Sequence, residues 1–352
     1  HDRIVSNMMK LPLTYRSAGV DIAAGDRFAD FIRALAKSTH GPDVVDAGDA
    51  YAGLYRLPTA DATQPVIAAT CDGVGTKLLV ARDCQDYRGI GQDLVAMNVN
   101  DLLPRGARPL LFLDYIAAGS LASVPLAQIA TGIAAACRQT GCALLGGETA
   151  ELPDAYREGD CDLAGFAVGI VEQSLAPRGD VCAGDLIVGL PSAGIHANGL
   201  SLARKVIAHA GLAYTDTLPT LDRSIGQELL RPTALYVDAV LTLMKAAQVK
   251  AAAHITGGGL LRRALKLCPP DLQLHIDPSS YPRPAIFSAL AALGSITEQE
   301  LAQTFNMGLG FLLIASPQDV DDMRKRTDVP LLVVGTVRSG SRAVDLGYAQ
   351  LA

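Results

Sequence analysis

The sequence of 352 residues contains no tryptophan, and aromatic residues make up only 5% of it. Its hydrophobic share is nevertheless 49%, against 19% charged residues, so the core must be built from Ala, Leu, Val and Ile. This composition argues against a disordered chain. Because the chain is longer than a single typical core allows, we expect two domains.

Paired cysteines are also missing. The seven cysteines are odd in number, and none stands in a Cys-x-x-Cys pair. This pattern indicates neither a zinc site nor a disulfide framework. We expect most of the cysteines, Cys71 included, to be small core residues in a reducing compartment.

Long apolar runs and strong basic patches are absent as well. No segment reaches the roughly 18 apolar residues that a membrane-spanning helix needs, and residues 1–9 lack the apolar core of a signal peptide. The net charge is −6, and the one basic cluster, residues 324–326, is flanked by Asp322 and Asp328. We therefore expect a cytoplasmic protein with neither membrane nor nucleic acid as a partner.

Apolar periodicity predicts alternating strands and helices in both halves of the chain. Strands are expected at 66–69, 110–116, 163–171, 185–190 and 311–315, and helices near 28–40, 91–103, 125–140 and 236–245 and from Leu200 and Leu260. This interleaving indicates an α/β to α+β fold. A break rich in Pro and Gly at 172–184 places a domain boundary there, which divides the chain into 1–174 and 175–352.

The motif that follows the first expected strand is Asp72-Gly73-Val74-Gly75-Thr76-Lys77. Its glycines allow close backbone approach, Lys77 adds a positive charge, and Asp72 adds a carboxylate. Such a loop suits a metal-bound polyphosphate. The Gly-x-x-x-x-Gly-Lys-Ser/Thr spacing of a Walker loop is missing, and an ordinary strand-end turn remains the alternative.

Acids in the first half are further candidates for this chemistry. Asp72, Asp101 and Glu148 stand at expected strand or helix ends, and Asp93 is a weaker candidate. Oxygen ligands from separate loops are what Mg²⁺ takes when it also binds phosphates. A helix cap or a surface charge is the alternative for each acid, and for Asp93 it is the favoured one.

Two loops in the second half have the pattern of anion sites. Ser192–Asn198 and Thr256–Gly259 each place backbone amides before an expected helix, where the helix dipole favours an anion. The glycines could equally serve tight turns only. His254 is as readily a packed histidine as a functional one. No Ser/His/Asp triad can be argued, since Gly-x-Ser-x-Gly is absent.

Several motifs together resemble the phosphoribosylformylglycinamidine cyclo-ligase (aminoimidazole ribonucleotide synthetase) family. They run in order from about Tyr15 to about Thr336. They are residues 72–77 (DGVGTK), 93–101 (DLVAMNVND), 146–151 (GGETAE), 194–202 (GIHANGLSL), 254–260 (HITGGGL) and 304–308 (TFNMG).

The resemblance implies an activity, cofactors and an assembly. The expected reaction is the ATP-dependent cyclisation of formylglycinamidine ribonucleotide to 5-aminoimidazole ribonucleotide, with release of ADP and phosphate, in de novo purine biosynthesis. ATP and Mg²⁺ are the implied cofactors. The implied fold has two domains, and the N-terminal sheets of a homodimer pair into a shared barrel.

The resemblance also implies roles for individual residues. Asp72, Asp101 and Glu148 resemble the Mg²⁺ and triphosphate ligands, with Lys77 beside them and His196 as a further catalytic candidate. The nucleotide side of the site would include Gly73, Gly75, Thr76, Gly146 and Gly147. The substrate side would include Ser192, His196, Asn198, Thr256, Gly257 and Gly258.

Some positions depart from the family pattern. The stretch Asp46–Gly53 is shorter than the glycine-rich run typical of the family, Arg33 stands where some members have lysine, and Tyr281–Pro284 replaces a segment where tryptophan is expected. The alternatives are therefore another ATP-using enzyme of the wider superfamily and a non-catalytic paralogue that binds nucleotide.

Overall fold

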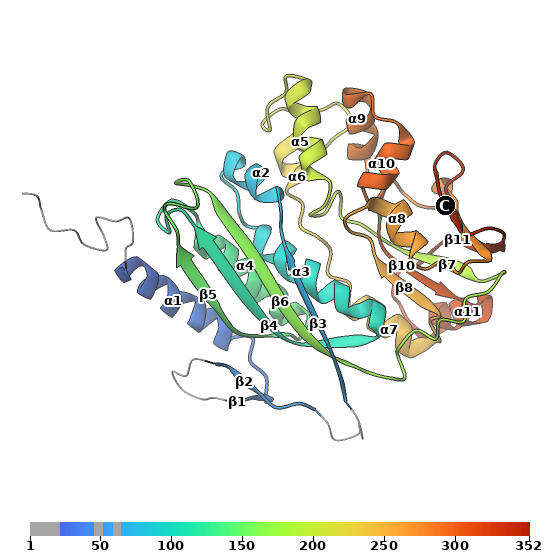
Figure 1. Ribbon diagram of the computed structural model, residues 1–352, viewed down its shortest axis with the longest axis horizontal. Helices are drawn as coiled ribbons and strands as arrows, with labels where there is room; N and C mark the ends of the chain where they lie inside the picture. Colours follow the sequence, from blue (N-terminus) through green and yellow to red (C-terminus); the bar gives the residue numbers. More distant parts are fainter. Residues whose placement is uncertain (1–21, 46–51, 59–64) are drawn as a thin grey trace, which may run out of the picture.

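The computed structural model describes residues 22–45, 52–58 and 65–352. The 46–53 stretch thus lies mostly outside the described residues. Two sheets dominate the fold, one of four strands from the N-terminal half and one of seven strands from the C-terminal half (Figure 1). The helices pack around and between these sheets.

The N-terminal half contains the four-stranded sheet, in the order β3-β6-β4-β5, and a separate β1-β2 pair. Strands β4 and β5 are parallel, and the other neighbours in the sheet are antiparallel. The elements are α1 (Ile22–Lys37), β1 (Val44–Val45), β2 (Leu54–Tyr55), β3 (Val66–Gly73), α2 (Lys77–Cys84), α3 (Ile90–Leu102), the 3-10 helix η2 (Leu103–Arg105), β4 (Ala107–Ala118), α4 (Leu126–Gln139), β5 (Ala143–Glu151) and β6 (Cys161–Val171).

The C-terminal half contains the seven-stranded sheet, in the order β13-β12-β9-β11-β7-β10-β8. All neighbours in it are antiparallel except β12 and β9. The elements are β7 (Leu186–Pro191), α5 (Leu200–His209), α6 (Ile225–Leu229), α7 (Val237–Ala246), β8 (Ala251–His254), α8 (Gly259–Leu265), β9 (Leu272–Ile276), η3 (Pro278–Ser280), α9 (Ala285–Gly294), α10 (Glu298–Thr304), β10 (Leu309–Ala315), α11 (Pro317–Arg326), β11 (Leu332–Ser339), β12 (Ala343–Asp345) and β13 (Gln350–Leu351).

The mixed α/β class predicted from the sequence is confirmed. One expected strand is longer than predicted, since β3 runs on to Gly73 and pairs with β6 along its whole length. Asp72 therefore lies inside a strand rather than in the loop that follows it. The sheets divide between Val171 and Leu186, and the boundary at 174/175 stays a prediction.

Helix α3 lies between the N-terminal sheet and the C-terminal half, and it contacts β3, β6, α4 and β8. Almost all of its residues are buried. It also crosses α4 closely, because a Cβ at Gly91 would lie 2.1 Å from the Ile129 carbonyl oxygen. Glycine at this position is thus what allows the two backbones to touch, and a side chain there would push α4 away from α3.

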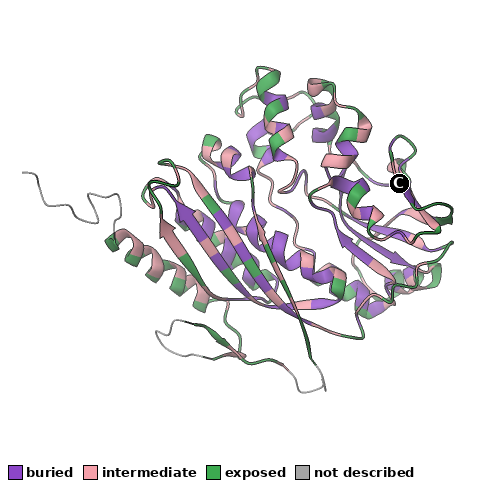
Figure 2. Ribbon diagram, viewed as in Figure 1, coloured by how far each residue is buried: buried purple, intermediate pink, exposed green. Residues whose placement is uncertain are grey.

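The four-stranded sheet has one covered face and one open face. Helices α3 and α4 cover the first (Figure 1). The second has exposed positions along its strands (Figure 2). Among them are Ile67, Leu113 and Phe166, which are 51%, 36% and 40% exposed. Cys71 lies in the same row as Leu113 and Phe166 and is exposed. The prediction that Cys71 is a core residue is wrong, because alternation along β3 turns it away from the helices.

A carboxyl group is buried on the covered face. Asp114 on β4 is 3% exposed, and neither of its carboxyl oxygens has a hydrogen-bond partner among the described residues. Its neighbours across the sheet are Gly165 and Gly147. Burial raises the pKa of Asp114 to about 7, so the folded protein keeps this group protonated where an unfolded chain would ionise it.

This shift predicts a pH-dependent stability. Between pH 5 and 7 the unfolded chain binds fewer protons at Asp114 than the folded protein, so the free energy of unfolding falls as pH rises. The expected loss is about 2 kcal/mol, at 1.36 kcal/mol per pKa unit. Urea titrations at both pH values should show this loss in the parent protein and not in Asp114→Asn. Equal slopes in the two proteins would contradict the assignment.

Candidate active site between the two halves

A cavity of about 410 Å³ lies where the end of β3 meets the C-terminal half. Its walls include Asp72, Gly73 and Gly75 from β3 and the following loop, Met97 from α3, Asp162 from β6, and Asn198 from the loop before α5. Gly75 has φ of 64°, a left-handed conformation that favours glycine at this turn. Four of the residues proposed from the sequence (Asp72, Gly73, Gly75 and Asn198) thus line one cavity.

Asp72 is held in place by the side chain of Asn98. The Asp72 backbone N–H donates to Asn98 Oδ1 at 2.9 Å, and Asn98 Nδ2 donates to the Asp72 carbonyl oxygen at 3.1 Å. Asn98 is fully buried, so this edge of β3 is tied to α3. Burial, followed by the nearby charge of Asp101, raises the pKa of the Asp72 carboxyl group. The two carboxyl groups are therefore close enough to interact electrostatically.

Asp101 is oriented by a histidine from the other half of the chain. Asp101 Oδ1 lies 2.7 Å from His254 Nδ1. The His254 side chain is 1% exposed and that of Asp101 is 34% exposed. The His254 ring stacks on Phe311 with a centroid separation of 6.2 Å. The rigid, buried partner is thus the histidine, and the acid is the solvent-facing member of the pair.

The glycine loop before α8 lies beside the same cavity. A Cβ at Gly257 would come within 3.4 Å of Asn198 Oδ1. The Gly257 carbonyl oxygen accepts a hydrogen bond of 2.9 Å from Arg263 Nε. Arg263 also lies close enough to Asp72 to favour its ionised form. The side chain of Thr256 is buried, and its hydroxyl has no hydrogen-bond partner among the described residues.

Glu148 does not join the other two acids within one subunit. Gly73, Ala164, Tyr115 and Glu148 form one row across the sheet. Asp72 is one position out of that row, so its side chain points to the opposite face. Three strand spacings, about 14 Å, also separate β3 from β5.

The prediction of a single metal site made by Asp72, Asp101 and Glu148 is therefore wrong for one subunit. No group of three His, Cys, Asp or Glu side chains in the described ranges could hold a metal ion. Gly146 and Gly147 share the far strand with Glu148, so they too lie away from the cavity. Side chains alternate between the two faces of the sheet along β5, and this sets the direction of the Glu148 side chain. The glycines before Glu148 hide this alternation in the sequence.

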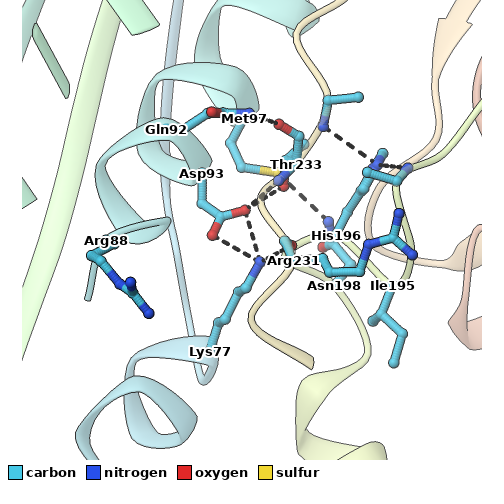
Figure 3. A network of polar contacts seen from close by, with 12 residues as sticks. Lys77, Arg88, Gln92, Asp93, Met97, Ile195, His196, Asn198, Arg231 and Thr233 are labelled. Atoms are coloured by element: carbon cyan, nitrogen blue, oxygen red, sulfur yellow. Dashed lines mark hydrogen bonds and ion pairs between the residues drawn. The ribbon is translucent and has the colours of Figure 1, made fainter. Parts of the chain in front are cut away.

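Lys77 is not available to a phosphate in this structure. Its side chain is fully buried, and its Nζ lies 2.9 Å from Asp93 Oδ1 and 2.6 Å from the Arg231 carbonyl oxygen (Figure 3). Asp93 Oδ1 also accepts hydrogen bonds from the backbone and hydroxyl groups of Thr233, at 2.7 and 2.6 Å. Lys77 and Asp93 thus fasten the segment around 231–233 to the N-terminal half, and the assignment of Lys77 to the triphosphate is corrected.

Three other residues predicted from the sequence, His196, Ser192 and Thr76, make hydrogen bonds within the protein close to the site. His196 is 2% exposed, and its Nε2 accepts a hydrogen bond of 3.0 Å from the Ala193 N–H. Burial lowers the pKa of His196 well below its usual range, so the ring is neutral. Ser192 Oγ donates to the Gly194 carbonyl at 2.9 Å and lies 3.0 Å from Asn306 Oδ1. Thr76 Oγ1 lies 3.0 Å from Ser201 Oγ, across the junction of the two halves.

Sequence reasoning missed Asn98, Met97, Asp162 and Arg263. Asn98 and Met97 lie within the motif 93–101, but the sequence does not show which residues of that helix point toward the site. Asp162 comes directly before the expected strand 163–171, and this is the one feature of the sequence that suggests a functional role for it. Arg263 lies outside the glycine loop and reaches it only through the turn of α8. The start of helix α8 is the signal that would have placed the Arg263 side chain beside the glycines at 257–259.

Comparison with known proteins agrees with this layout. The family model described as AIR synthase related protein, N-terminal domain, matches residues 50–171, and the corresponding C-terminal domain model matches residues 183–345. Among solved structures, thiamine-monophosphate kinase from Stenotrophomonas maltophilia has a TM-score of 0.64 at 23% identity, covering 91% of this chain and 95% of that one. The hydrogenase maturation protein HypE, solved in complex with ATP, has a TM-score of 0.60 at 17% identity, covering 93% of both chains. These likenesses define the fold.

Sequence relatives are more similar. Phosphoribosylformylglycinamidine cyclo-ligase from Myxococcus xanthus is 47% identical over 309 residues, which are 87% of this chain and 90% of that protein. The counterpart from Trichlorobacter lovleyi is 42% identical over 340 residues, or 95% and 97% of the two chains. Trifunctional purine biosynthetic protein adenosine-3 from Bos taurus is 46% identical over 320 residues, which are 90% of this chain and 31% of that protein.

The fold, the cavity between the two halves and the two matching domain models thus show that this is a two-domain protein of the AIR synthase related class. Within that class, the chain belongs to the phosphoribosylformylglycinamidine cyclo-ligase family, a family of ligases in purine biosynthesis. The resemblance stated from the motifs is confirmed. None of the helices in the described ranges is both long and apolar enough to cross a membrane.

Proposed function

We propose that this chain catalyses the ATP-dependent closure of formylglycinamidine ribonucleotide to 5-aminoimidazole ribonucleotide in the cavity lined by Asp72 and Asn198. Phosphorylation of the formyl oxygen by ATP turns a poor leaving group into a good one. An amidine nitrogen then attacks the activated carbon, and phosphate leaves as the ring closes. The observation that carries the proposal is the meeting of Asp72 and Asn198 at one cavity between the halves, with Asp101 close enough to Asp72 to raise the pKa of its carboxyl group.

The chain's own residues position the reactants in this proposal. Asp72 and Asp101 face the triphosphate side, while Asn198 and the loop from Thr256 to Gly258 face the sugar phosphate. The amides of that loop and Arg263 supply positive character in a chain whose net charge is −6. Because phosphoryl transfer depends on positioning and charge neutralisation, this set is sufficient for the protein's part.

Magnesium fits the two acids. Asp72 is partly buried and its pKa is raised by burial and by Asp101, so a divalent cation would relieve the repulsion between the carboxylates. Mg²⁺ needs only one or two carboxylates when substrate phosphates and water complete its shell. Asp72 and Asp101 would hold it, and it would supply neutralisation of the phosphate charge.

The test of this function is direct. The protein is mixed with formylglycinamidine ribonucleotide, ATP and Mg²⁺, and aminoimidazole ribonucleotide and ADP are measured together. We expect equal amounts of the two products. ADP formed without the imidazole would favour another ATP-using reaction, and ATP binding without either product would favour the non-catalytic paralogue.

His254 is proposed to position Asp101, and this predicts a graded response. His254→Phe should lower the affinity for Mg²⁺ in the presence of the ATP analogue by about 10- to 100-fold, the usual effect of losing a group that orients a metal ligand. His254→Asn, whose amide can donate to Asp101 in the same direction, should recover most of the loss. Isothermal titration of Mg²⁺ with a non-hydrolysable ATP analogue measures both. Equal affinities in the two variants would contradict a positioning role.

A homodimer is proposed to form through the open face of the four-stranded sheet. Ile67, Leu113 and Phe166 leave that face apolar and exposed, and a second copy would cover it. Glu148 lies on the same face, so any contact it makes with bound ATP would have to come through this pairing. The nucleotide roles of Glu148, Gly146 and Gly147 therefore depend on the dimer.

Charge on this face should separate the subunits. Phe166→Asp places an unpaired carboxylate at the proposed interface and should raise the dimer dissociation constant by at least about 100-fold, or roughly 2.7 kcal/mol. Tyr348→Asp is the matched control, because Tyr348 is 37% exposed and lies in the C-terminal half. Sedimentation equilibrium distinguishes the two. A Phe166→Asp protein that stays as dimeric as the control would exclude this interface.

A further inference from the structure

The larger of the two described cavities lies apart from the candidate active site. Its volume is about 910 Å³, and it shares no lining residue with the smaller cavity. The end of α2 and the turn after it form one wall, and α5, the loop 212–215 and the α6 region form the others. Both halves of the chain therefore contribute to it.

The floor of this cavity is a tight contact between the halves. A Cβ at Gly226 would lie 2.6 Å from Cys84 Sγ and 3.1 Å from Tyr214 Cβ. No side chain larger than hydrogen fits at that position without a shift. The two halves are thus closely packed at this floor, and this favours a preformed site.

The charges around the cavity are unequally paired. Arg82 donates to Asp83 Oδ1 at 3.0 and 2.9 Å, and Arg88 donates to the Asp86 carboxylate at 2.9 and 2.6 Å. The acids at this rim therefore already have cationic partners.

Arg204 and Lys205 have none. Neither forms an ion pair with any carboxylate in the described part of the chain. Arg204 lies close enough to Tyr214 to act on the pKa of its hydroxyl group, and the Arg204 Nε is buried without a hydrogen-bond partner among the described residues. A guanidinium N–H in that state lacks the acceptor that such groups normally find. Two cations next to each other on α5 thus line a cavity whose two carboxylates, Asp83 and Asp86, are already paired with Arg82 and Arg88.

The lining also has an apolar part, formed by Ile207, Leu212, Leu230 and the Tyr214 ring, and a polar part that includes Thr215, Ser224 and Gln227. A volume near 900 Å³ falls within the range of small-molecule sites, about 300–1,000 Å³. An inorganic anion alone would leave most of these apolar side chains exposed to water. The lining instead suits an anion that carries an organic body.

We propose that this cavity binds a phosphomonoester of nucleotide size, with its phosphate on Arg204 and Lys205 and its body against Leu212 and Leu230. Arginine and lysine together match a phosphate, because the planar guanidinium can donate two parallel hydrogen bonds. The Tyr214 hydroxyl adds a further polar group beside the phosphate. Since both halves line the cavity, the ligand bridges them and stabilises their arrangement.

Calorimetric titration of the full-length protein with adenosine 5′-monophosphate tests this site. Arg204→Ala/Lys205→Ala should weaken binding by about tenfold or more, because it removes both charge-assisted contacts. Lys245→Ala/Lys266→Ala makes the same change in net charge at exposed positions outside the cavity and should bind as the parent does. Asn198→Ala, in the other cavity, should also leave this affinity unchanged.

A second variant guards against misfolding. Ala208 is exposed at the rim of the cavity, so Ala208→Trp should fill the space without disturbing the core and should also weaken binding by about tenfold. Unchanged affinity in both cavity variants, or loss of binding in Asn198→Ala alone, would overturn the proposal. Inorganic phosphate that binds as tightly as the nucleotide would overturn the assignment of an organic body. None of these readouts depends on turnover, so a failed cyclisation assay leaves this test standing.

Discussion

Replacing Lys77 with methionine is expected to lower the free energy of unfolding by about 3–5 kcal/mol, the usual cost of breaking a buried ion pair by removing one partner. Both side chains of the Lys77–Asp93 pair are completely buried. Loss of the ammonium leaves the Asp93 carboxylate in the interior with only the hydrogen bonds from Thr233. The Arg231 carbonyl oxygen would lose its donor in the same step. Urea unfolding measures the change.

The charge rather than the shape of Lys77 should cause this loss. Lys77→Met/Asp93→Leu removes both charges and should be less destabilised than Lys77→Met, because no unpaired charge remains. Arg33→Ala is the control for an exposed pair. Arg33 and Asp30 are 56% and 73% exposed, and this pair should contribute under about 1 kcal/mol. A double variant as unstable as the single one would show that packing, not charge, dominates.

Asp101→Asn is expected to lower kcat by about 10²- to 10³-fold, with little change in the free energy of unfolding. The substitution removes a charge that would neutralise the metal and phosphate, and metal-assisted stabilisation is worth several kcal/mol, at about 1.36 kcal/mol per tenfold in rate. Asp101 is partly exposed, so the fold should tolerate the change. Steady-state kinetics and urea unfolding of the same preparation separate the two effects.

Asp72→Asn should reduce kcat by a similar factor, and the two substitutions together should cost less than the sum of their separate effects. Groups that act on one metal are not additive. The matched control is Asp162→Asn, since Asp162 lines the same cavity but is exposed on β6. A loss in Asp162→Asn as large as that in Asp101→Asn would move the metal site toward β6.

The fold could be predicted from the sequence where one signal dominated. Leucine and valine spacing located the helix now seen as α3 (Ile90–Leu102) to within a residue at each end. Apolar runs located β10, whose residues are all buried. The end of β3 could not be predicted in this way, because its residues Thr70 to Gly73 show no alternation of apolar and polar side chains and read as a loop.

The site was predictable in its membership but not in its geometry. Asp72 and Asn198 come from motifs far apart in the sequence, and both line the cavity. The sequence could not say that Glu148 faces the other side of the sheet, since one residue of register reverses a side chain. It also could not say that Lys77 would find Asp93, because that pairing depends on how α2 packs against α3 and the segment around Arg231.

The proposed metal and triphosphate site is tested most directly by a crystal structure with a non-hydrolysable ATP analogue and Mn²⁺, in which anomalous scattering locates the metal. We predict a metal peak within coordination distance of Asp72 and Asp101, with the sugar-phosphate side of the cleft at Asn198 and Gly257. A metal bound only near Glu148, or a triphosphate seated on Arg204 and Lys205 with the smaller cavity empty, would contradict this assignment.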